Sequence, residues 1–246
     1  MNNQFIKKAN LSIVIPTLNE ENNLPLLLES IEIQSVDDCE IIIADANSED
    51  KTIEIARGHD CKVAPGGLPA EGRNNGAKLA KGSVLLFLDA DAVLPEGFFE
   101  KALGEFEKKE LKIASFPLLP HGEKRIPRLL FQFFYNLPII AMEKVLPHAA
   151  MGILIDKELF EKLNGFDENI KIAEDHDLAR RAKRAGKYGI IKSSKIFVSD
   201  RRFKTDGWLK TYFKYFLCEL HMIFIGPVKS NIFSYKFNHY FKNKED

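Results

Sequence analysis

Residues 83–91 read SVLLFLDAD, an apolar run that ends in two carboxylates separated by one alanine. An uninterrupted apolar run of this length is typical of a strand that is buried on both faces. In open α/β sheets, ligands bind beyond the carboxyl ends of the strands. The stretch therefore predicts a buried strand that carries Asp89 and Asp91 to the binding edge of a sheet.

Two more buried strands are predicted on the N-terminal side, LSIVI at 11–15 and EIIIA at 40–44. Between them, apolar residues recur at helical spacing from Leu24 to Ile31. Short strands that alternate with helices are the signature of β-α-β units. We therefore expect an α/β fold in which helices flank a mainly parallel sheet over this part of the chain.

The alternation loosens after about residue 115. Residues 151–156 predict a strand, and EDHDLARRAKRAGK at 174–187 predicts a helix. Near the C-terminus, aromatic and leucine residues spaced four apart from Trp208 to Phe224 form one broad apolar stripe, which is more often core packing than a lipid-facing surface. We expect one domain over 1–203 and a basic, aromatic helical extension over 204–246.

The composition, 246 residues of which 45% are apolar and 28% charged, fits one large globular domain with an appendage. The three cysteines form no C-x-x-C pair, so the sequence indicates neither a zinc ribbon nor a redox dithiol, and a reducing compartment is expected. The first apolar run is too short for a signal peptide, and the runs at 129–142 and 215–228 fall short of the roughly 20 residues of a membrane span. These patterns predict a cytoplasmic protein.

The formal net charge of zero conceals an uneven distribution of charge along the chain. Residues 1–177 carry a balance of −11, and residues 178–246 carry a balance of +11. The acidic part suits a metal cation, and the basic part suits a phosphate or an anionic surface. We expect no nucleic acid among the partners.

Carboxylates at neighbouring strand ends give the predicted edge its chemistry. Asp89 and Asp91 can hold a hard divalent cation, Mg²⁺ or Mn²⁺, or can instead form a polar strand end that caps the next helix. Asp45 ends the preceding strong strand, where it suits a hydrogen bond to a ribose or base, or the cap of a helix that begins near Ser48. The run Pro16-Thr17-Leu18-Asn19-Glu20 follows the first strand at the same edge.

Two further polar clusters are candidates for binding and catalysis. Arg73 lies just before a predicted helix, after the glycines at 66–67, where it could bind a ligand oxyanion or belong to a flexible surface turn.

The run Glu174-Asp175-His176-Asp177 opens another predicted helix. A carboxylate among other carboxylates can have a raised pKa and act as a base, and Asp175 is the candidate; the alternative is a solvated helix whose charges suit the macrodipole.

Three histidines, His148, His176 and His221, could each complete a metal site. A lone histidine is more often held by structural partners than by a metal, and nothing in the spacing of these three separates the two roles.

Four segments together carry a family resemblance: SIVIPTLNEE at 12–21, EIIIADANSEDKT at 40–52, GRNNGAKLAKGSVLLFLDAD at 72–91, and NGFDE with AEDHDLARRAKRAGK between 164 and 187. In this order and spacing, the chain resembles family 2 glycosyltransferases of the GT-A fold over about residues 10–203. The resemblance implies a mixed central sheet, with a nucleotide half over about 10–95 and an acceptor half over about 96–203. It also implies a nucleotide-diphosphate sugar donor and inverting transfer to an acceptor hydroxyl or lipid phosphate.

The resemblance assigns roles residue by residue. The expected donor-binding residues are Pro16, Thr17, Asn19, Glu20, Asp45, Arg73, Asp89, Arg201 and Arg202. Among these, Asp45 would hold the base or ribose, Arg73 would lie near the base or phosphates, and the two C-terminal arginines would hold the diphosphate.

The metal and catalytic roles implied by the resemblance fall on acidic residues. Asp91 would ligate Mg²⁺ or Mn²⁺ directly, while Asp89 would contact both the ribose and the metal. Asp175, with Glu174 beside it, would deprotonate the acceptor hydroxyl.

The sequence departs from the family pattern in two places. Ser199 and Phe203 stand where processive polysaccharide synthases have the Gln and Trp of a Q-x-x-R-W motif, which disfavours processive synthesis. The run Asp45-Ala46-Asn47-Ser48 replaces the commoner D-D-G-S.

Two other functions fit part of the pattern. A sugar-1-phosphate nucleotidyltransferase would share the nucleotide half and the metal, but its Gly-rich loop directly follows the first strand, where this chain has PTLNEE. A non-catalytic nucleotide-sugar-binding protein would not need the intact acidic clusters.

The C-terminal extension has two interpretations. Its tail, NIFSYKFNHYFKNK at 231–244, interleaves aromatic residues with lysines, which suits peripheral contact with an anionic membrane. Alternatively, the helix packs on the domain and the basic residues serve only the diphosphate.

Overall fold

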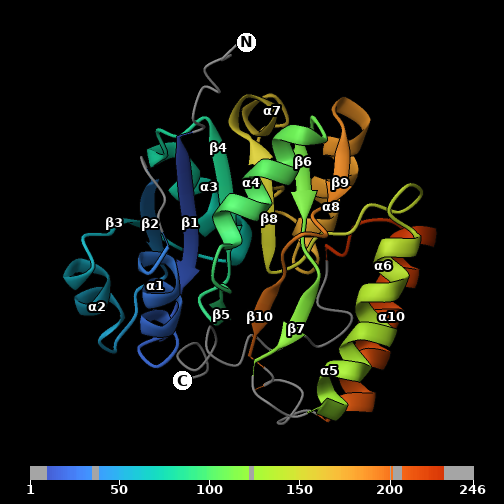
Figure 1. Cartoon of the computed structure of the whole chain (residues 1–246), viewed down its shortest axis with the longest axis horizontal. Helices are drawn as coiled ribbons and strands as arrows, with labels where there is room; N and C mark the ends of the chain where they lie inside the picture. Colours follow the sequence, from blue (N-terminus) through green and yellow to red (C-terminus); the bar gives the residue numbers. More distant parts are fainter. Residues whose placement is uncertain (1–9, 35–38, 122–124, 200, 202–206, 230–246) are drawn as a thin grey trace, which may run out of the picture.

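The computed structural model describes residues 10–34, 39–121, 125–199, 201 and 207–229. A central sheet carries helices on both faces, with a smaller sheet beside it (Figure 1). The strands are β1 (Leu11–Thr17), β2 (Cys39–Asp45), β3 (Lys62–Pro65), β4 (Val84–Leu88), β5 (Ala92–Val93), β6 (Ile113–Ser115), β7 (Leu118–Pro120), β8 (Gly152–Asp156), β9 (Tyr188–Ile190) and β10 (Ile196–Val198). The helices are α1 (Leu24–Glu32), α2 (Thr52–Gly58), α3 (Pro69–Leu79), α4 (Phe98–Lys108), α5 (Arg125–Phe131), the π-helical turn η1 (Gln132–Asn136), α6 (Leu137–Ala141), α7 (Lys157–Lys162), α8 (Glu174–Ala185) and α10 (Trp208–Phe224).

The central sheet is mixed, as predicted. Its seven strands have the order β3-β2-β1-β4-β8-β6-β9, and the smaller sheet has the order β5-β10-β7. The strands β2 and β4 both run parallel to β1, whereas β8 is antiparallel to β4 and β6. Because β1, β2 and β4 are parallel, the loops that follow them meet at one edge of the sheet.

Both faces of the central sheet are buried. Alternate residues of β1 face two separate apolar clusters: Ile13 and Ile15 pack with residues of α1 and α4, and Val14 packs with residues of α3 and α8. Every residue of β1 and β4 is buried, as their uninterrupted apolar runs predict.

The packing of α10 corrects the expectation that its apolar stripe is core. The helix contacts the rest of the chain through Cys218 and Met222, which pack with Val228. Three large side chains of the stripe are exposed instead: Phe213 by 61%, Phe216 by 58% and Phe224 by 79%. Among the described side chains of the helix, Cys218 and Met222 therefore face the domain and these three aromatic ones face outward, while the stripe residues Trp208, Leu209 and Tyr212 lie outside the described side chains.

The arm formed by α5, η1 and α6 is anchored to the smaller sheet by one buried amide. Asn136 is fully buried, and its Oδ1 accepts from the N–H of Leu118 at 2.9 Å. Its Nδ2 donates to the carbonyl of Leu118 at 2.7 Å. Within the arm, Phe133 and Phe134 are exposed, so this segment also presents aromatic rings outward.

The absence of a side chain at Gly76 lets α3 lie close against β1. A Cβ built on Gly76 would lie 2.4 Å from Cγ1 of Val14, which is fully buried in the sheet. A β-branched side chain in a packed core has little room to yield, so the approach of helix and strand depends on glycine at this position.

We predict that Gly76→Ala destabilises the fold by about 1–3 kcal/mol, because the added methyl overpacks the core. Gly104→Ala is the matched control: Gly104 lies on the exposed face of α4, where an added Cβ meets nothing within 4 Å, and alanine favours the helix. Urea unfolding of both variants measures the difference. A Gly76→Ala chain as stable as the Gly104→Ala chain would contradict this account of the packing.

Candidate active site

The carboxylate of Asp45 is held in place at the carboxyl edge of the sheet. Its Oδ1 accepts from Thr17 Oγ1 at 3.0 Å and from Ser48 Oγ at 2.5 Å, and its Oδ2 accepts from the Ser48 N–H at 2.8 Å. Pro16 and Thr17 are buried at the end of β1. The expectation that Asp45 caps a helix beginning near Ser48 is wrong, because α2 begins at Thr52 with Lys51 as its N-cap residue. The bonds from Ser48 hold Asp45 within the turn that precedes the helix. A ligand that reaches Asp45 would share a carboxylate that the protein has already oriented.

The loop after β1 is bonded to the loop after β2. Asn19 has a left-handed backbone, with φ of 53°, and its Oδ1 accepts from the Glu49 N–H at 2.8 Å. The N–H of Glu20 donates to Thr52 Oγ1 at 2.8 Å. Asn19 is therefore held through its side chain and Glu20 through its backbone, while the Glu20 carboxylate accepts from Asn23 and Arg201.

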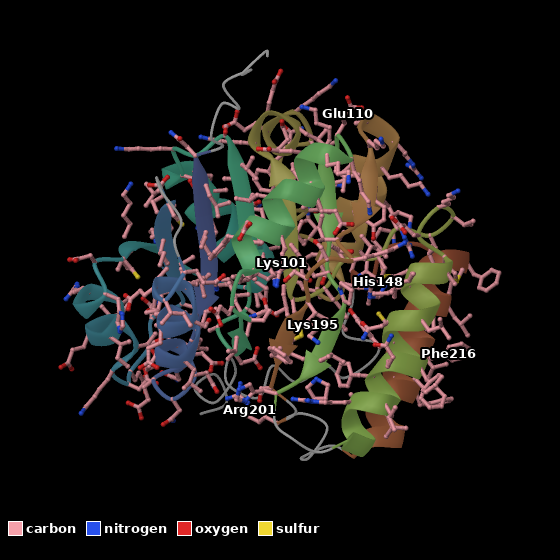
Figure 2. The ribbon with its side chains drawn as sticks, viewed as in Figure 1. Lys101, Glu110, His148, Lys195, Arg201 and Phe216 are labelled. Atoms are coloured by element: carbon pink, nitrogen blue, oxygen red, sulfur yellow. The ribbon has the colours of Figure 1, made fainter. Side chains whose placement is uncertain are left out.

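Arg201 lies beside this acidic edge (Figure 2). Its Nη2 is 3.2 Å from Oε1 of Glu20 and 3.9 Å from Oδ2 of Asp91. The N–H of Ser199 donates to the carbonyl of Asp91 at 3.2 Å, which joins the segment after β10 to the D-x-D turn. The Arg201 side chain is 43% exposed, so it borders solvent at this edge. Arg202 lies outside the described residues.

A buried arginine joins the two halves of the chain. Arg73 lies inside α3, not before the helix as the sequence suggested, and its side chain is only 7% exposed. Its Nη2 donates to Asp89 Oδ1 at 2.7 Å, and its Nη1 donates to Glu174 Oε1 at 2.5 Å. The guanidinium also lies over the ring of Phe166, 5.4 Å from the ring centre. We call these two hydrogen bonds of the guanidinium the Arg73 fork. They exclude the flexible-turn alternative and bring the D-x-D turn next to the start of α8.

The adjacent acids Glu174 and Asp175 have different electrostatic surroundings. Burial raises the pKa of Glu174, the Asp175 carboxylate raises it further, and Arg73 opposes both effects. Burial alone would also raise the pKa of Asp175, but His176, Arg73 and His148 hold that pKa below its ordinary value. Two neighbouring carboxyls whose pKa values are pushed apart are suited to different roles. The expectation of a raised pKa at Asp175 is therefore wrong: the raised pKa belongs to Glu174, and the cations around Asp175 keep that carboxylate ionised.

The candidate histidines have protein partners. His176 Nδ1 lies 2.7 Å from Asp175 Oδ1, and His148 Nε2 lies 3.1 Å from the hydroxyl of Tyr135. His221 Nδ1 lies 3.0 Å from the carbonyl of Gly226. Within the part of the chain that the structure describes, no three His, Cys, Asp or Glu side chains converge as a metal ion would require. These contacts agree with the structural interpretation of all three histidines.

A small cleft of about 160 Å³ opens beside Asp91. Its lining residues are Asn23, Leu26, Asp91, Ala92, Val93, His121 and Ser199. Asn23 and His121 are not among the residues that the sequence predicted for the site. His121 directly follows β7, a three-residue strand that carries no recognisable periodicity, so its position beside the D-x-D had no local signal.

The acidic side chains at this edge fit part of a magnesium or manganese site. Asp91 lines the cleft, and one oxygen of Asp89 is bonded to Arg73 while the other accepts no hydrogen bond from a described residue. Two carboxylates are too few to enclose a cation, but Mg²⁺ commonly binds one or two carboxylates together with waters and substrate phosphates. The donor set therefore suits a cation that arrives with a phosphate ligand.

The family model for "Glycosyl transferase family 2" matches residues 12–162, more than half of the chain. This chain belongs to glycosyl transferase family 2. The matched range includes both strand-end acidic groups and Arg73, and it ends before Glu174 and Asp175. The membership predicted from the four motifs, and the enzyme class with it, are confirmed.

Among curated relatives, the chain is 29% identical over 214 residues to the minor teichoic acid biosynthesis protein GgaB of Bacillus subtilis, which covers 80% of this chain and 23% of GgaB. It is 30% identical over 185 residues to an uncharacterized glycosyltransferase of Haemophilus influenzae, covering 68% of this chain and 60% of that protein. The chain thus spans between about a quarter and three fifths of the length of these two relatives.

Two solved structures share the GT-A architecture. The first, TarS 1–349 of S. aureus, is 19% identical with a TM-score of 0.64, covering 88% of this chain and 72% of that one. The second is a mannosyltransferase of Pyrobaculum calidifontis in complex with GDP-Man and Mn²⁺, 23% identical with a TM-score of 0.62, covering 76% of this chain and 55% of that one. At these identities the likeness supports the fold.

We predict that Arg73→Met lowers the free energy of unfolding by about 3–5 kcal/mol, because it leaves two largely buried carboxylates without their shared cation. Lys112→Met is the matched control, since the Lys112 ammonium is half exposed and its pair with Asp156 contributes about 0–1 kcal/mol. Urea unfolding at neutral pH measures both variants. Equal losses would show that the fork stabilises the fold no more than a surface ion pair does.

Proposed function

We propose that this chain transfers a sugar from a nucleotide-diphosphate sugar to an acceptor hydroxyl or a lipid phosphate, with inversion at the anomeric carbon. The proposal is carried by the Arg73 fork, which joins the D-x-D turn to the first turn of α8. A donor phosphate near Asp91 and an acceptor near Asp175 would therefore meet beside one buried guanidinium. Complexes of the structural neighbours, TarS with UDP-GlcNAc and the mannosyltransferase with GDP-Man, support this class of donor.

The donor would bind across the polar loops that follow β1 and β2. The wall formed by Pro16, Thr17, Asn19 and Glu20 faces the nucleotide in this proposal, and Asp45 binds its ribose or base. Because Asp45 is already held by Thr17 and Ser48, the site is oriented before the donor arrives, which lowers the entropic cost of binding.

Charge neutralisation of the leaving diphosphate would come from the basic side of the edge. Arg201, and Arg202 beside it in the sequence, would move onto the phosphates from the acidic groups that Arg201 contacts now. Asp91, with Asp89, would hold Mg²⁺ or Mn²⁺, which neutralises charge on the leaving group when it is bound. In this arrangement the arginines would bind the phosphates and the acids would bind the metal ion, so the present contacts between Arg201 and the acids would be broken.

Asp175 would act as the base for a hydroxyl acceptor. The acceptor oxygen forms a bond to the anomeric carbon while the bond from that carbon to the diphosphate oxygen breaks, and the acceptor proton passes to the Asp175 carboxylate. A single displacement of this kind inverts the anomeric configuration. Glu174 would orient the site through Arg73 and would not receive the proton.

Two variants should separate these roles. Asp91→Asn should remove most of the Mn²⁺-dependent rise in melting temperature that a nucleotide sugar produces, because a ligand specific for the folded state stabilises it according to its affinity. Asp175→Asn should keep that rise and lower kcat by about 10²-fold or more. A product of retained anomeric configuration would overturn the single displacement. Transfer undiminished in EDTA would overturn the role of the metal.

We also propose peripheral contact with the cytoplasmic face of a membrane, as the source of a lipid-linked acceptor. Of the fifteen exposed large apolar side chains in the described residues, eleven lie between 129 and 145 or between 213 and 225. These residues are Leu129, Phe133, Phe134, Leu137, Met142, Val145, Phe213, Phe216, Leu217, Phe224 and Ile225. We call them the aromatic face; α5, α6 and α10 lie on the same side of the molecule, and Phe216 points outward there (Figures 1 and 2).

The charge near the aromatic face favours an anionic lipid surface as its occupant. Lys144, Lys210 and Lys229 are exposed on or beside the same segments. Lysines near aromatic rings suit the boundary between lipid and water, and each adds about 1 kcal/mol toward anionic lipid. No helix in the described residues is long and apolar enough to cross a bilayer. Contact by side chains at the interface is the arrangement that this pattern supports.

We predict that the chain floats with phosphatidylglycerol vesicles at low salt, and less at high salt, since salt screens the lysines. The double change Phe213→Ser and Phe216→Ser should abolish flotation. Leu79→Ser, at an exposed position of α3 outside the aromatic face, should not change it. A chain that stays unbound at both salt concentrations would overturn the membrane proposal. If the chain instead forms dimers, and the double variant does not, the occupant of the aromatic face is a second copy.

A further inference from the structure

The carboxylate of Asp175 is anchored through one of its two oxygens. Its Oδ1 lies 2.7 Å from Nδ1 of His176 and 2.8 Å from the backbone nitrogen of the same residue. Among the described residues, no donor is bonded to its Oδ2. Within the described residues, the hydrogen bonds to this carboxylate therefore converge on Oδ1.

The imidazole of His176 is fixed by a second histidine. The rings of His176 and His148 are 3.9 Å apart between centres and meet at 75°. His148 is held at two points: its Nε2 by the hydroxyl of Tyr135, and its backbone by Tyr188, whose hydroxyl donates to the His148 carbonyl at 2.6 Å. Figure 2 shows His148 between the central sheet and α6. His176 is itself buried, so its orientation is set by these contacts.

We propose that His176, held by His148, is a positioning residue for Asp175, and that its protonation lowers the rate of transfer at acid pH. This inference rests on the proposed function of Asp175 as the base. Neutral His176 donates from Nδ1 to Oδ1 and leaves Oδ2 facing the acceptor. An imidazolium would place a full positive charge beside the carboxylate and make it a weaker base.

Charged and titratable groups of the described residues approach His176 from several elements. Asp175 and Glu174 precede it on α8, Arg180 follows one turn later, Arg73 approaches from α3, and His148 and Tyr188 lie on the other side. The arginines stay charged, and burial raises the pKa of Tyr188. The pKa of Asp175 is held below its ordinary value. Of these groups, only the two histidines have ordinary pKa values near 6.5.

Two substitutions separate the hydrogen bond from the charge. His176→Asn keeps a donor close to the position of Nδ1 but cannot ionise, and His176→Leu keeps apolar bulk without a donor. We expect His176→Asn to retain kcat within about threefold and to move the acid limb of the kcat/KM profile to lower pH. We expect His176→Leu to lower kcat by about 10-fold or more, with the KM for donor unchanged. His59→Asn is the control, because His59 bonds Glu32 away from this site.

The reference variant Asp175→Asn distinguishes failure of this inference from failure of the proposed function. If Asp175→Asn is fully active, Asp175 is not the base and the proposed mechanism fails first. If Asp175→Asn is inactive while His176→Leu keeps wild-type kcat, or His176→Asn keeps the wild-type acid limb, the positioning role of His176 is overturned. His148→Phe, which keeps a ring but does not titrate, should preserve the acid limb if His176 is its source. Melting temperatures of all variants check that each is folded.

Discussion

The contact of Arg73 with Asp89 and Glu174 is the interaction on which the rest of the site depends. It places one cation between two carboxylates that belong to different halves of the chain. Removal of Arg73 leaves the buried Glu174 carboxylate without its cation, which costs several kcal/mol. The position of the D-x-D turn relative to α8 is thereby tied to a contact that costs several kcal/mol to break.

Charge balance at the edge of the sheet extends this arrangement. Five acidic residues, Glu20, Asp89, Asp91, Glu174 and Asp175, lie around two arginines, one buried and one exposed. The buried arginine is fixed and structural, while the exposed Arg201 neutralises Glu20 and approaches Asp91. In the proposed function, a metal-bound diphosphate would replace both contacts of Arg201, because its cation would bind the acids and its phosphates would bind the arginine.

Sequence periodicity predicted the parts of the fold that local chemistry determines. The buried strands β1, β2 and β4 and the acidic ends of β2 and β4 were identified because uninterrupted apolar runs and strand-end carboxylates leave a local signal. Arg73 was expected before a helix and lies within one. Its pairing with Glu174 could not be predicted, because the two residues are 101 positions apart and no local pattern indicates the contact. The outward-facing stripe of α10 was wrongly assigned to the core because periodicity shows that a helix has an apolar side, not what covers it.

The amide of Asn136 has a consequence for how the smaller sheet is protected. β7 is an outer strand of that sheet, and Asn136 bonds both polar groups of Leu118 as a neighbouring strand would. An outer strand with free N–H and carbonyl groups is a template for pairing with another chain and for aggregation. The side chain of Asn136 thus occupies the outward N–H and carbonyl of the first residue of β7. These two groups are then not available for pairing with a strand of another chain.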